Sequence, residues 1–295
     1  MKQAERGFLL LSSCLGDPSR RPLTTAQLRV LADRSWRMRA PDKERELEAE
    51  DLMALGYGRE QAERILALLA QDDLLEHYLY RGRRAGCVPL TRVSEEYPLR
   101  LRKRLGLDSP GVLWAKGDLS LLNGPMLALV GSRDLQPANE AFAREVGRQA
   151  ARQGYTLVSG NARGSDRAAQ YACLAEGGRV ISVVADELAN KTVRDRMLYL
   201  SEEDFDREFS TQRALSRNRV IHALGDKTLV AQCGCGTGGT WNGTVRNLRF
   251  GWSPVFCFRD GSAAAAQLEQ MGASLIEMSD LLDFQALCCD KISFF

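Results

Sequence analysis

Residues 127–166 constrain the fold of this chain more than any other segment. An apolar run, 127–130, is followed by a polar turn at 131–133 and by a helical stretch, 139–153, with its apolar residues on one face. A second apolar run, 155–158, leads into a glycine-containing loop, 159–166. This order predicts a parallel βαβ unit whose strands are buried on both faces. Both polar loops then lie at the carboxyl ends of strands, where open α/β sheets bind their ligands.

The chemistry of these two loops suits a phosphate-rich ligand. Gly131 and Gly160 permit close backbone approach, while Arg133 and Arg163 supply forked cationic donors. A helix expected from about residue 165 points its N-terminus into the same crevice. Asp166 has two interpretations, a helix-start residue that satisfies free N–H groups or a member of the ligand site. The loops lack the GxGxxG pattern with a later acidic residue, so no dinucleotide cofactor is predicted.

Two later segments add candidate anion-binding groups. Arg217 and Arg219 fall near the start of a helix expected from residue 214, where cations oppose the helix dipole, and this placement suggests a bound anion. The most glycine-dense loop, 234–240, precedes a helix expected at 241–249 and again allows backbone N–H groups to approach an anion. It is not a P-loop, because the Gly-Lys-Ser/Thr signature is missing.

These motifs resemble the DNA-processing protein A (DprA/Smf) family. The matching segments are VGSR at 130–133, SGNARGSD at 159–166 and RNRVI at 217–221, preceded by a YP…KGD approach at 97–118. The resemblance covers about residues 52–282. It implies a Rossmann-like domain that binds and protects single-stranded DNA and presents it to a RecA-type recombinase in DNA uptake or recombination.

The chain also departs from the family pattern. The usual glycine-rich turn and YP dipeptide after the strand at 180–184 are replaced by residues 185–191, and the segment 202–206 is unusually acidic. The winged helix that some members carry at the C-terminus is expected to be absent. Whether the protein forms a homodimer is left open.

Composition excludes several other classes of protein. No apolar run approaches 18 residues, so no membrane span is expected. The eight cysteines include no CxxC pair, and the two histidines are far apart, so neither a structural metal site nor a Ser-His-Asp triad is predicted. Reduced thiols in a cytoplasmic protein are the favoured interpretation.

We expect two domains. Residues 1–118 are predicted to form a small helical domain with a helix-hairpin-helix-like turn at 56–58, and residues 119–295 a doubly wound, mostly parallel Rossmann-like sheet of about six or seven strands. Arginines and one lysine crowd the stretch 81–104. This stretch is either a solvated helix face or a nucleic-acid path beside the main domain.

The leading hypothesis is sequence-independent binding of single-stranded DNA without catalysis. One alternative is a sensor that binds a nucleotide-derived ligand in the same crevice. The other is a nucleoside-monophosphate phosphoribohydrolase of the LOG type, whose GGxGT loop resembles 238–240. It is disfavoured because Gly243 stands where the catalytic glutamate is expected. The candidate DNA- or phosphate-binding residues are Gly131, Ser132, Arg133, Ser159, Gly160, Arg163, Gly164, Asp166, Arg217, Asn218, Arg219, Gly238, Gly239 and Thr240.

Overall fold

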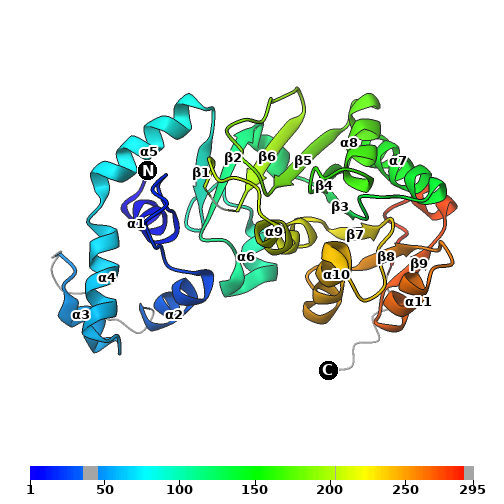
Figure 1. Ribbon diagram of the computed structural model, residues 1–295. Helices are drawn as coiled ribbons and strands as arrows, with labels where there is room; N and C mark the ends of the chain where they lie inside the picture. The colour runs from blue at the N-terminus through cyan, green and yellow to red at the C-terminus, as the bar shows by residue number, and fades with distance from the viewer. Residues whose placement is uncertain (36–45, 203, 289–295) are drawn as a thin grey trace.

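A nine-stranded sheet forms the centre of the protein (Figure 1) in a computed structural model that describes residues 1–35, 46–202 and 204–288. The seven strands from β6 to β9 in spatial order run parallel, and β1 and β2 add an antiparallel edge. The predicted α/β class is therefore confirmed. In spatial order the strands are β1 (Val88–Thr91), β2 (Val112–Gly117), β6 (Met197–Ser201), β5 (Arg179–Val184), β4 (Thr156–Ser159), β3 (Met126–Val130), β7 (Lys227–Val230), β8 (Val255–Phe258) and β9 (Ser274–Ile276).

Helices cover both faces of this sheet, as its largely apolar central strands require. Along β3, Leu127 and Leu129 belong to one buried cluster, whereas Ala128 and Val130 belong to the other. The first cluster includes residues of α7 (Pro137–Arg152) and α8 (Ser165–Ala175). The second includes residues of α6 (Leu99–Leu105), α9 (Thr211–Leu224), α10 (Gly238–Phe250) and α11 (Ala263–Gln270). Among the described residues there are also three short 3-10 helices, at Gly106–Asp108, Leu119–Leu122 and Met278–Leu282.

The N-terminal helices both pack among themselves and join the main core. A small cluster around Leu52 and Ile65 holds them together, and the predicted glycine turn at 56–58 does connect two of them. At the junction with the sheet, Tyr78 stacks on Phe205 at 4.6 Å between ring centroids and meets Trp114 edge-on at 5.5 Å. These helices are α1 (Gln3–Ser12), α2 (Thr25–Ser35), α3 (Ala49–Ala54), α4 (Arg59–Leu69) and α5 (Asp72–Arg84).

The sheet extends beyond the region predicted for it, and one predicted helix boundary was wrong. Residues after 118 supply seven strands, β3–β9, as expected, while β2 pairs with β6 and β1 with β2, so that two strands from before residue 118 complete the sheet. Helix α9 begins at Thr211 rather than near 214, since the hydroxyl of Ser210 accepts the backbone N–H of Arg213 at 3.1 Å and caps it. Arg217 and Arg219 therefore lie in the helix interior, and the dipole argument for an anion at these residues does not apply.

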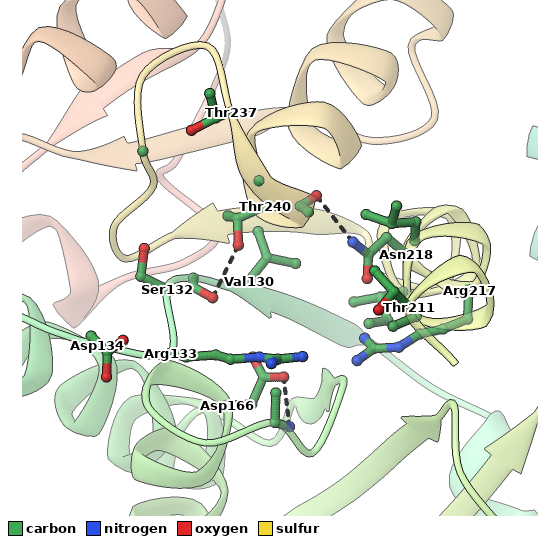
Figure 2. Close-up of a pocket in the computed structure, with 18 residues that line it drawn as sticks. Val130, Ser132, Arg133, Asp134, Asp166, Thr211, Arg217, Asn218, Thr237 and Thr240 are labelled. Carbon is green, nitrogen blue, oxygen red and sulfur yellow. Dashed lines mark hydrogen bonds between the residues drawn. The ribbon is translucent and has the colours of Figure 1, made fainter. Parts of the chain in front are cut away.

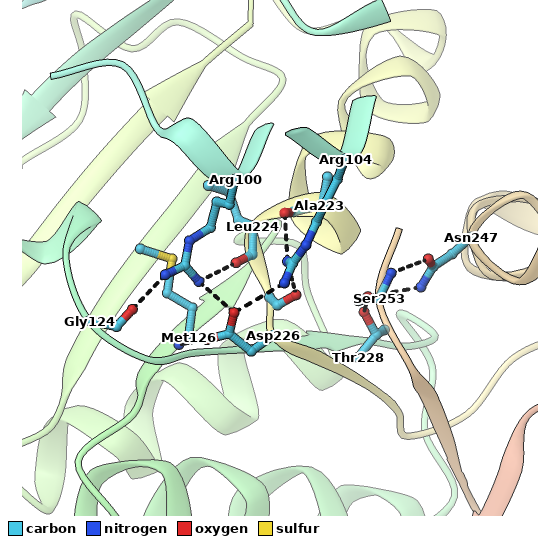
Figure 3. A network of polar contacts seen from close by, with 11 residues as sticks. Arg100, Arg104, Gly124, Met126, Ala223, Leu224, Asp226, Thr228, Asn247 and Ser253 are labelled. Atoms are coloured by element: carbon cyan, nitrogen blue, oxygen red, sulfur yellow. Dashed lines mark hydrogen bonds and ion pairs between the residues drawn. The ribbon is translucent and has the colours of Figure 1, made fainter. Parts of the chain in front are cut away.

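The basic stretch 81–104 is tied largely to the protein itself. Arg100 and Arg104 both reach Oδ1 of Asp226, at 2.9 and 3.2 Å, and donate to carbonyl oxygens at the end of α9 (Figure 3). Arg81 pairs with Asp206 at 3.1 Å. Cations that satisfy the last carbonyls of a helix stabilise its C-terminus, so these arginines serve the fold. Within the described ranges, no helix has the length and apolar character needed to cross a membrane.

Candidate phosphate-binding site

A cavity of about 490 Å³ opens where the strand order of the sheet reverses. Successive strands β3, β4 and β5 run outward on one side of β3, and β7, β8 and β9 run outward on the other. Helix α7, which follows β3, and α10, which follows β7, lie on opposite faces, so a crevice forms beyond the ends of β3 and β7. Figure 2 shows this cavity enclosed by the 131–134 turn, the loop before α8, one side of α9 and the start of α10.

Two arginines point toward each other in the middle of the cavity (Figure 2). Arg217 comes from α9, is only 8% exposed, and donates from Nη2 to the carbonyl of Gly160 at 3.1 Å, while its Nε has no partner. Arg133 extends from the end of β3, is exposed, and makes no ion pair with any described residue. Burial lowers the pKa of Arg217, but a guanidinium stays protonated in proteins. The cavity therefore holds two positive charges with unused donors.

The position of the Arg217 guanidinium depends on the absence of a side chain at Gly160. A β-carbon on Gly160 would lie 1.8 Å from Nη1 of Arg217, so only glycine lets the guanidinium rest against this loop. Gly131 and Gly164 bring the two loops together in the same way. A β-carbon on Gly131 would lie 2.0 Å from Oγ of Ser165, and Gly164, at φ +83°, would place one 2.4 Å from the carbonyl of Ser132.

Asp166 holds the loop rather than capping the helix. Its Oδ2 accepts the backbone N–H groups of Gly160 at 3.0 Å and Ala162 at 3.1 Å, and Gly164 occupies the N-cap of α8. Asp166 thus lies in the first turn of α8 and satisfies backbone N–H groups, as the helix-start interpretation proposed, but these groups belong to the preceding loop and not to the helix. Burial raises the pKa of Asp166, while the charges of Arg217 and Arg133 and the two backbone hydrogen bonds oppose that rise.

The opposite wall is the N-terminus of α10. Gly238, Gly239 and Thr240 form its first turn, which contains no acidic residue. The hydroxyl of Thr240 donates to the carbonyl of Gly131 at 3.0 Å, and Nδ2 of Asn218 donates to the carbonyl of Gly239 at 3.1 Å (Figure 2). Neither α9 nor α10 contains an Asp or Glu. Across the cavity the N-terminus of α10 faces two arginines, an arrangement suited to bind an anion, and the carboxylates that line the cavity, Asp134 and Asp166, come from its other side.

The structure brings most of the predicted site residues to the cavity. Those that line it are Gly131, Ser132, Arg133, Asp166, Arg217, Asn218, Gly238, Gly239 and Thr240. Gly160 and Gly164 do not line the cavity, but their lack of a side chain lets Arg217 and the 131–134 turn pack closely at its wall. Lining residues that sequence reasoning missed include Asp134, Thr211 and Thr237. The Ser210-Thr211 pair before α9 is a helix-start signal that could have indicated Thr211.

Three predicted residues lie elsewhere. Ser159 is fully buried, and its hydroxyl accepts from Nε2 of Gln170 at 2.6 Å. Arg163 pairs with Asp134 at 2.6 Å in a neighbouring surface groove. The third residue, Arg219, is buried and does not line the cavity.

The contacts of Arg219 explain its exclusion. Both of its terminal nitrogens bond the carboxylate of Glu202, and Nη1 also donates to the carbonyl of Ser216 at 2.9 Å. A guanidinium already paired with a buried carboxylate is not free to hold a phosphate.

The surroundings of Gly243 disfavour the hydrolase hypothesis. A β-carbon there would lie 3.1 Å from Nε2 of His222 and 3.3 Å from Cβ of Asn218, so a glutamate would fit only if these neighbours moved. Burial, with a further contribution from Arg217, lowers the pKa of His222 to about 3. His222 is therefore neutral at pH 7 and a weak base.

The sheet and the cavity define a Rossmann-like α/β protein whose topological switch point holds a crevice lined by two arginines and a helix N-terminus. A family model for DNA recombination-mediator protein A matches residues 89–285, and the chain belongs to this family. The resemblance seen in the sequence motifs is thereby confirmed.

Curated relatives include DNA processing protein DprA of Bacillus subtilis, 29% identical over 52% of this chain and 54% of that protein. DprA of Streptococcus pneumoniae is 34% identical over 42% of this chain and 48% of that protein. The chain thus spans about half the length of the curated relatives it matches.

Solved structures agree with the fold. The crystal structure of S. pneumoniae DprA aligns over 96% of this chain and 97% of that one, with a TM-score of 0.73 and 26% identity. A structure concerned with the single-stranded DNA binding mode of Helicobacter pylori DprA covers 66% of this chain and 94% of that one, with a TM-score of 0.55 and 22% identity. At that identity the second likeness supports the fold alone.

Proposed function

We propose that this protein binds single-stranded DNA through its phosphates at the switch-point cavity and performs no chemistry on it. The observation that carries the proposal is the convergence of Arg133, Arg217 and the N-terminus of α10 on one cavity of about 490 Å³. Contacts of this kind hold the backbone without reading bases. The name of the curated relatives, DNA processing protein DprA, supports the same conclusion.

The shape of the site favours a single strand over a duplex. Proteins that read duplex DNA present a helix or a β-ribbon to the major groove. Here one of the two cationic side chains is buried inside a cavity, and the helix terminus faces inward. A flexible single strand can enter such a site, and its phosphates can approach both arginines. Delivery of the bound strand to a RecA-type recombinase is the partner step that the family resemblance implies.

A nucleotide-derived small ligand is the second candidate. The cavity volume lies within the range of about 300–1,000 Å³ that is usual for small-molecule sites. Its anion-binding groups would serve a mononucleotide as well as a strand. Hydrolysis of that ligand is not proposed, because Gly243 and the neutral His222 supply no general acid or base.

The test is a salt titration of oligonucleotide binding. Arg133→Ala should weaken binding of oligo(dT) and oligo(dA) by the same factor, and should reduce the slope of log affinity against log salt by about 0.7. Its melting temperature should not change, because Arg133 is exposed and unpaired within the described residues. Arg152→Ala is the matched control, since this exposed arginine lies at the far end of α7 and pairs with Glu176.

Two outcomes would count against the proposal. Unchanged affinity and slope for folded Arg133→Ala would remove the site. Tight binding of a nucleoside monophosphate by the wild type, with no binding of either oligonucleotide, would favour the small-ligand candidate instead.

A further inference from the structure

A second groove, of about 500 Å³, adjoins the cavity on the side of α7 and α8. The two share Arg133 and Asp134, so a ligand that leaves the cavity past Arg133 enters this groove directly. The remaining residues that line it are Leu135, Glu140, Arg144, Arg163, Gly164, Arg167, Ala168 and Tyr171.

The groove carries more positive than negative charge. Its arginines at 133, 144, 163 and 167 face two carboxylates, Asp134 and Glu140. Arg163 pairs with Asp134 and Arg144 with Glu140, each at 2.6 Å. Arg133 and Arg167 are left without an ion pair among the residues that the structure describes. Unpaired, exposed guanidinium groups in a groove attract a polyanion.

An exposed aromatic ring stands beside these arginines. Tyr171 is 58% exposed, and it makes no hydrogen bond or ring stack within the described part of the chain. It follows Arg167 by four residues on α8, so the two side chains share one face of the helix. Sites for single-stranded nucleic acid combine cations that follow the backbone with aromatic rings on which bases stack.

We propose that the groove is a second subsite for the same DNA strand, in which Arg167 binds a phosphate and a base stacks on Tyr171. The inference rests on the proposed function, because Arg133 links the groove to the cavity. It adds a contact to the bases, whereas the cavity contacts phosphates. It also sets a direction for the strand, from the switch point outward along α8.

Oligonucleotide length separates the two subsites. A short oligo(dT) of about three nucleotides can occupy the cavity alone, whereas one of about 15–20 can also reach the groove. Tyr171→Ala should bind the short strand as the wild type does and should bind the long strand at least about fivefold more weakly, the lower end of the effect of losing one stacked base. Tyr171→Phe should restore wild-type binding, because the phenyl ring still stacks. Arg167→Ala should reduce the salt slope for the long strand only.

The controls distinguish stacking from a general effect. Tyr80→Ala removes another exposed tyrosine, 53% exposed, from α5 in the N-terminal helices, and should leave both affinities unchanged. A long strand with abasic sites should bind the wild type and Tyr171→Ala equally. Melting curves establish that each variant is folded.

Failure of this inference is distinguishable from failure of the proposed function. If the wild type binds no strand, the function itself is wrong. If it binds but Tyr171→Ala matches Tyr80→Ala at both lengths, or weakens both lengths equally, the groove is not a separate DNA subsite. A variant that loses self-association in sedimentation while keeping full DNA affinity would identify the groove as a protein contact and overturn the proposal.

Discussion

At the scale of single residues, the site depends on what Gly160 lacks. The guanidinium of Arg217 occupies the volume that any β-carbon on residue 160 would take, and its bond to the carbonyl of Gly160 fixes its direction. Arg217 therefore enters the cavity in one orientation although its Nε has no partner. Glycine contributes to this site by making room for another side chain, and its own conformational freedom is not needed there.

Gly160→Ala is predicted to impair binding more than folding. The added methyl group would meet the far end of a flexible side chain, so Arg217 can swing away while the backbone stays in place. We expect about a tenfold loss of single-strand affinity, the value of one charge-assisted hydrogen bond, with a small fall in melting temperature. Gly7→Ala, where a β-carbon would meet nothing within 4 Å, is the control. If Gly160→Ala bound single strands with wild-type affinity, the position of Arg217 against residue 160 would not be needed for binding.

At the scale of elements, the acidic segment after β6 fastens the N-terminal helices to the sheet. Asp206 accepts from the hydroxyl of Tyr78 at 2.6 Å and pairs with Arg81 on the same helix, α5. Asp204 accepts the backbone N–H of Cys14 at 2.8 Å, just after α1. Asp204 and Asp206, two of the acidic residues that make this segment unlike the family pattern, thus form an internal junction.

Asp204 makes this junction sensitive to pH. Burial raises its pKa from 3.8 to about 6, opposed by hydrogen bonds from Ser13 and Cys14, while Asp206 raises it further and Arg207 lowers it. Between about pH 4 and 6 the folded protein binds more protons here than the unfolded chain does. The contribution of Asp204 to the free energy of unfolding therefore falls as pH rises, by about 3 kcal/mol in all.

The prediction is that Asp204→Asn removes this dependence. Relative to the wild type, the variant should gain stability as pH rises from about 4 to 7.5, with most of the gain below about pH 6.5. Urea unfolding at several pH values measures the free energy of unfolding of both proteins. In the difference between the two, the contributions of the carboxylates that they share cancel. Parallel stability profiles of the two proteins would contradict the raised pKa.

Asp226 joins three elements and should be costly to remove. Its carboxylate accepts from Arg100, Arg104 and the backbone N–H of Met126, the last at 2.9 Å, and so links α6, the end of α9 and β3 (Figure 3). Asp226→Ala is expected to lower the free energy of unfolding by about 2–3 kcal/mol, because several charge-assisted hydrogen bonds are lost together. Glu176→Ala breaks a single, largely exposed pair with Arg152 and should cost at most about 0.5 kcal/mol. Equal unfolding midpoints for the two variants would refute this prediction.

The parallel core of the sheet could be predicted well, because each of its strands and loops is indicated by residues that are neighbours in the sequence. The run at 127–130 is apolar throughout and forms a strand buried on both faces, and the polar turn after it supplies Arg133 to the cavity. The fate of Arg219 could not be predicted in this way. Its partner, Glu202, lies in a segment whose position depends on the whole sheet, and nothing near residue 219 indicates a carboxylate.

The strand β1 could not be predicted for a related reason. The strand β1 is four residues long and contains a proline, so it lacks the alternation that identifies a strand. Its place in the sheet follows from its pairing with β2, and β2 in turn pairs with β6, more than 80 residues later in the chain. Such pairing is a property of the assembled fold.

At the scale of the whole molecule, we propose that the smallest unit able to bind DNA begins near residue 86 rather than at 119. A chain of residues 119–288 lacks β2, so β6 keeps its pairing with β5 but exposes the backbone groups of its other edge, and the chain should aggregate. A chain of residues 86–288 keeps the complete sheet and the cavity. It loses the helices that cover Trp114 and Phe205 and should be less stable. We expect its affinity for oligo(dT) to lie within about tenfold of that of the full chain, because it keeps the cavity that is proposed to bind DNA.

Gel filtration and anisotropy measure these outcomes for both truncated chains. Soluble 119–288 with full binding would contradict the assignment of β1 and β2 to the essential sheet. Folded 86–288 without binding would assign part of the site to the N-terminal helices.

The outermost strands also bear on how copies of this protein could associate. One border of the sheet is β1, where Pro89 offers no backbone N–H, and the other is β9, only three residues long. A proline and a very short strand both prevent a neighbouring chain from extending the hydrogen-bonded ladder. Assembly into dimers or along a strand of DNA must therefore use helices and loops, and the sheet is protected from growing into a fibre.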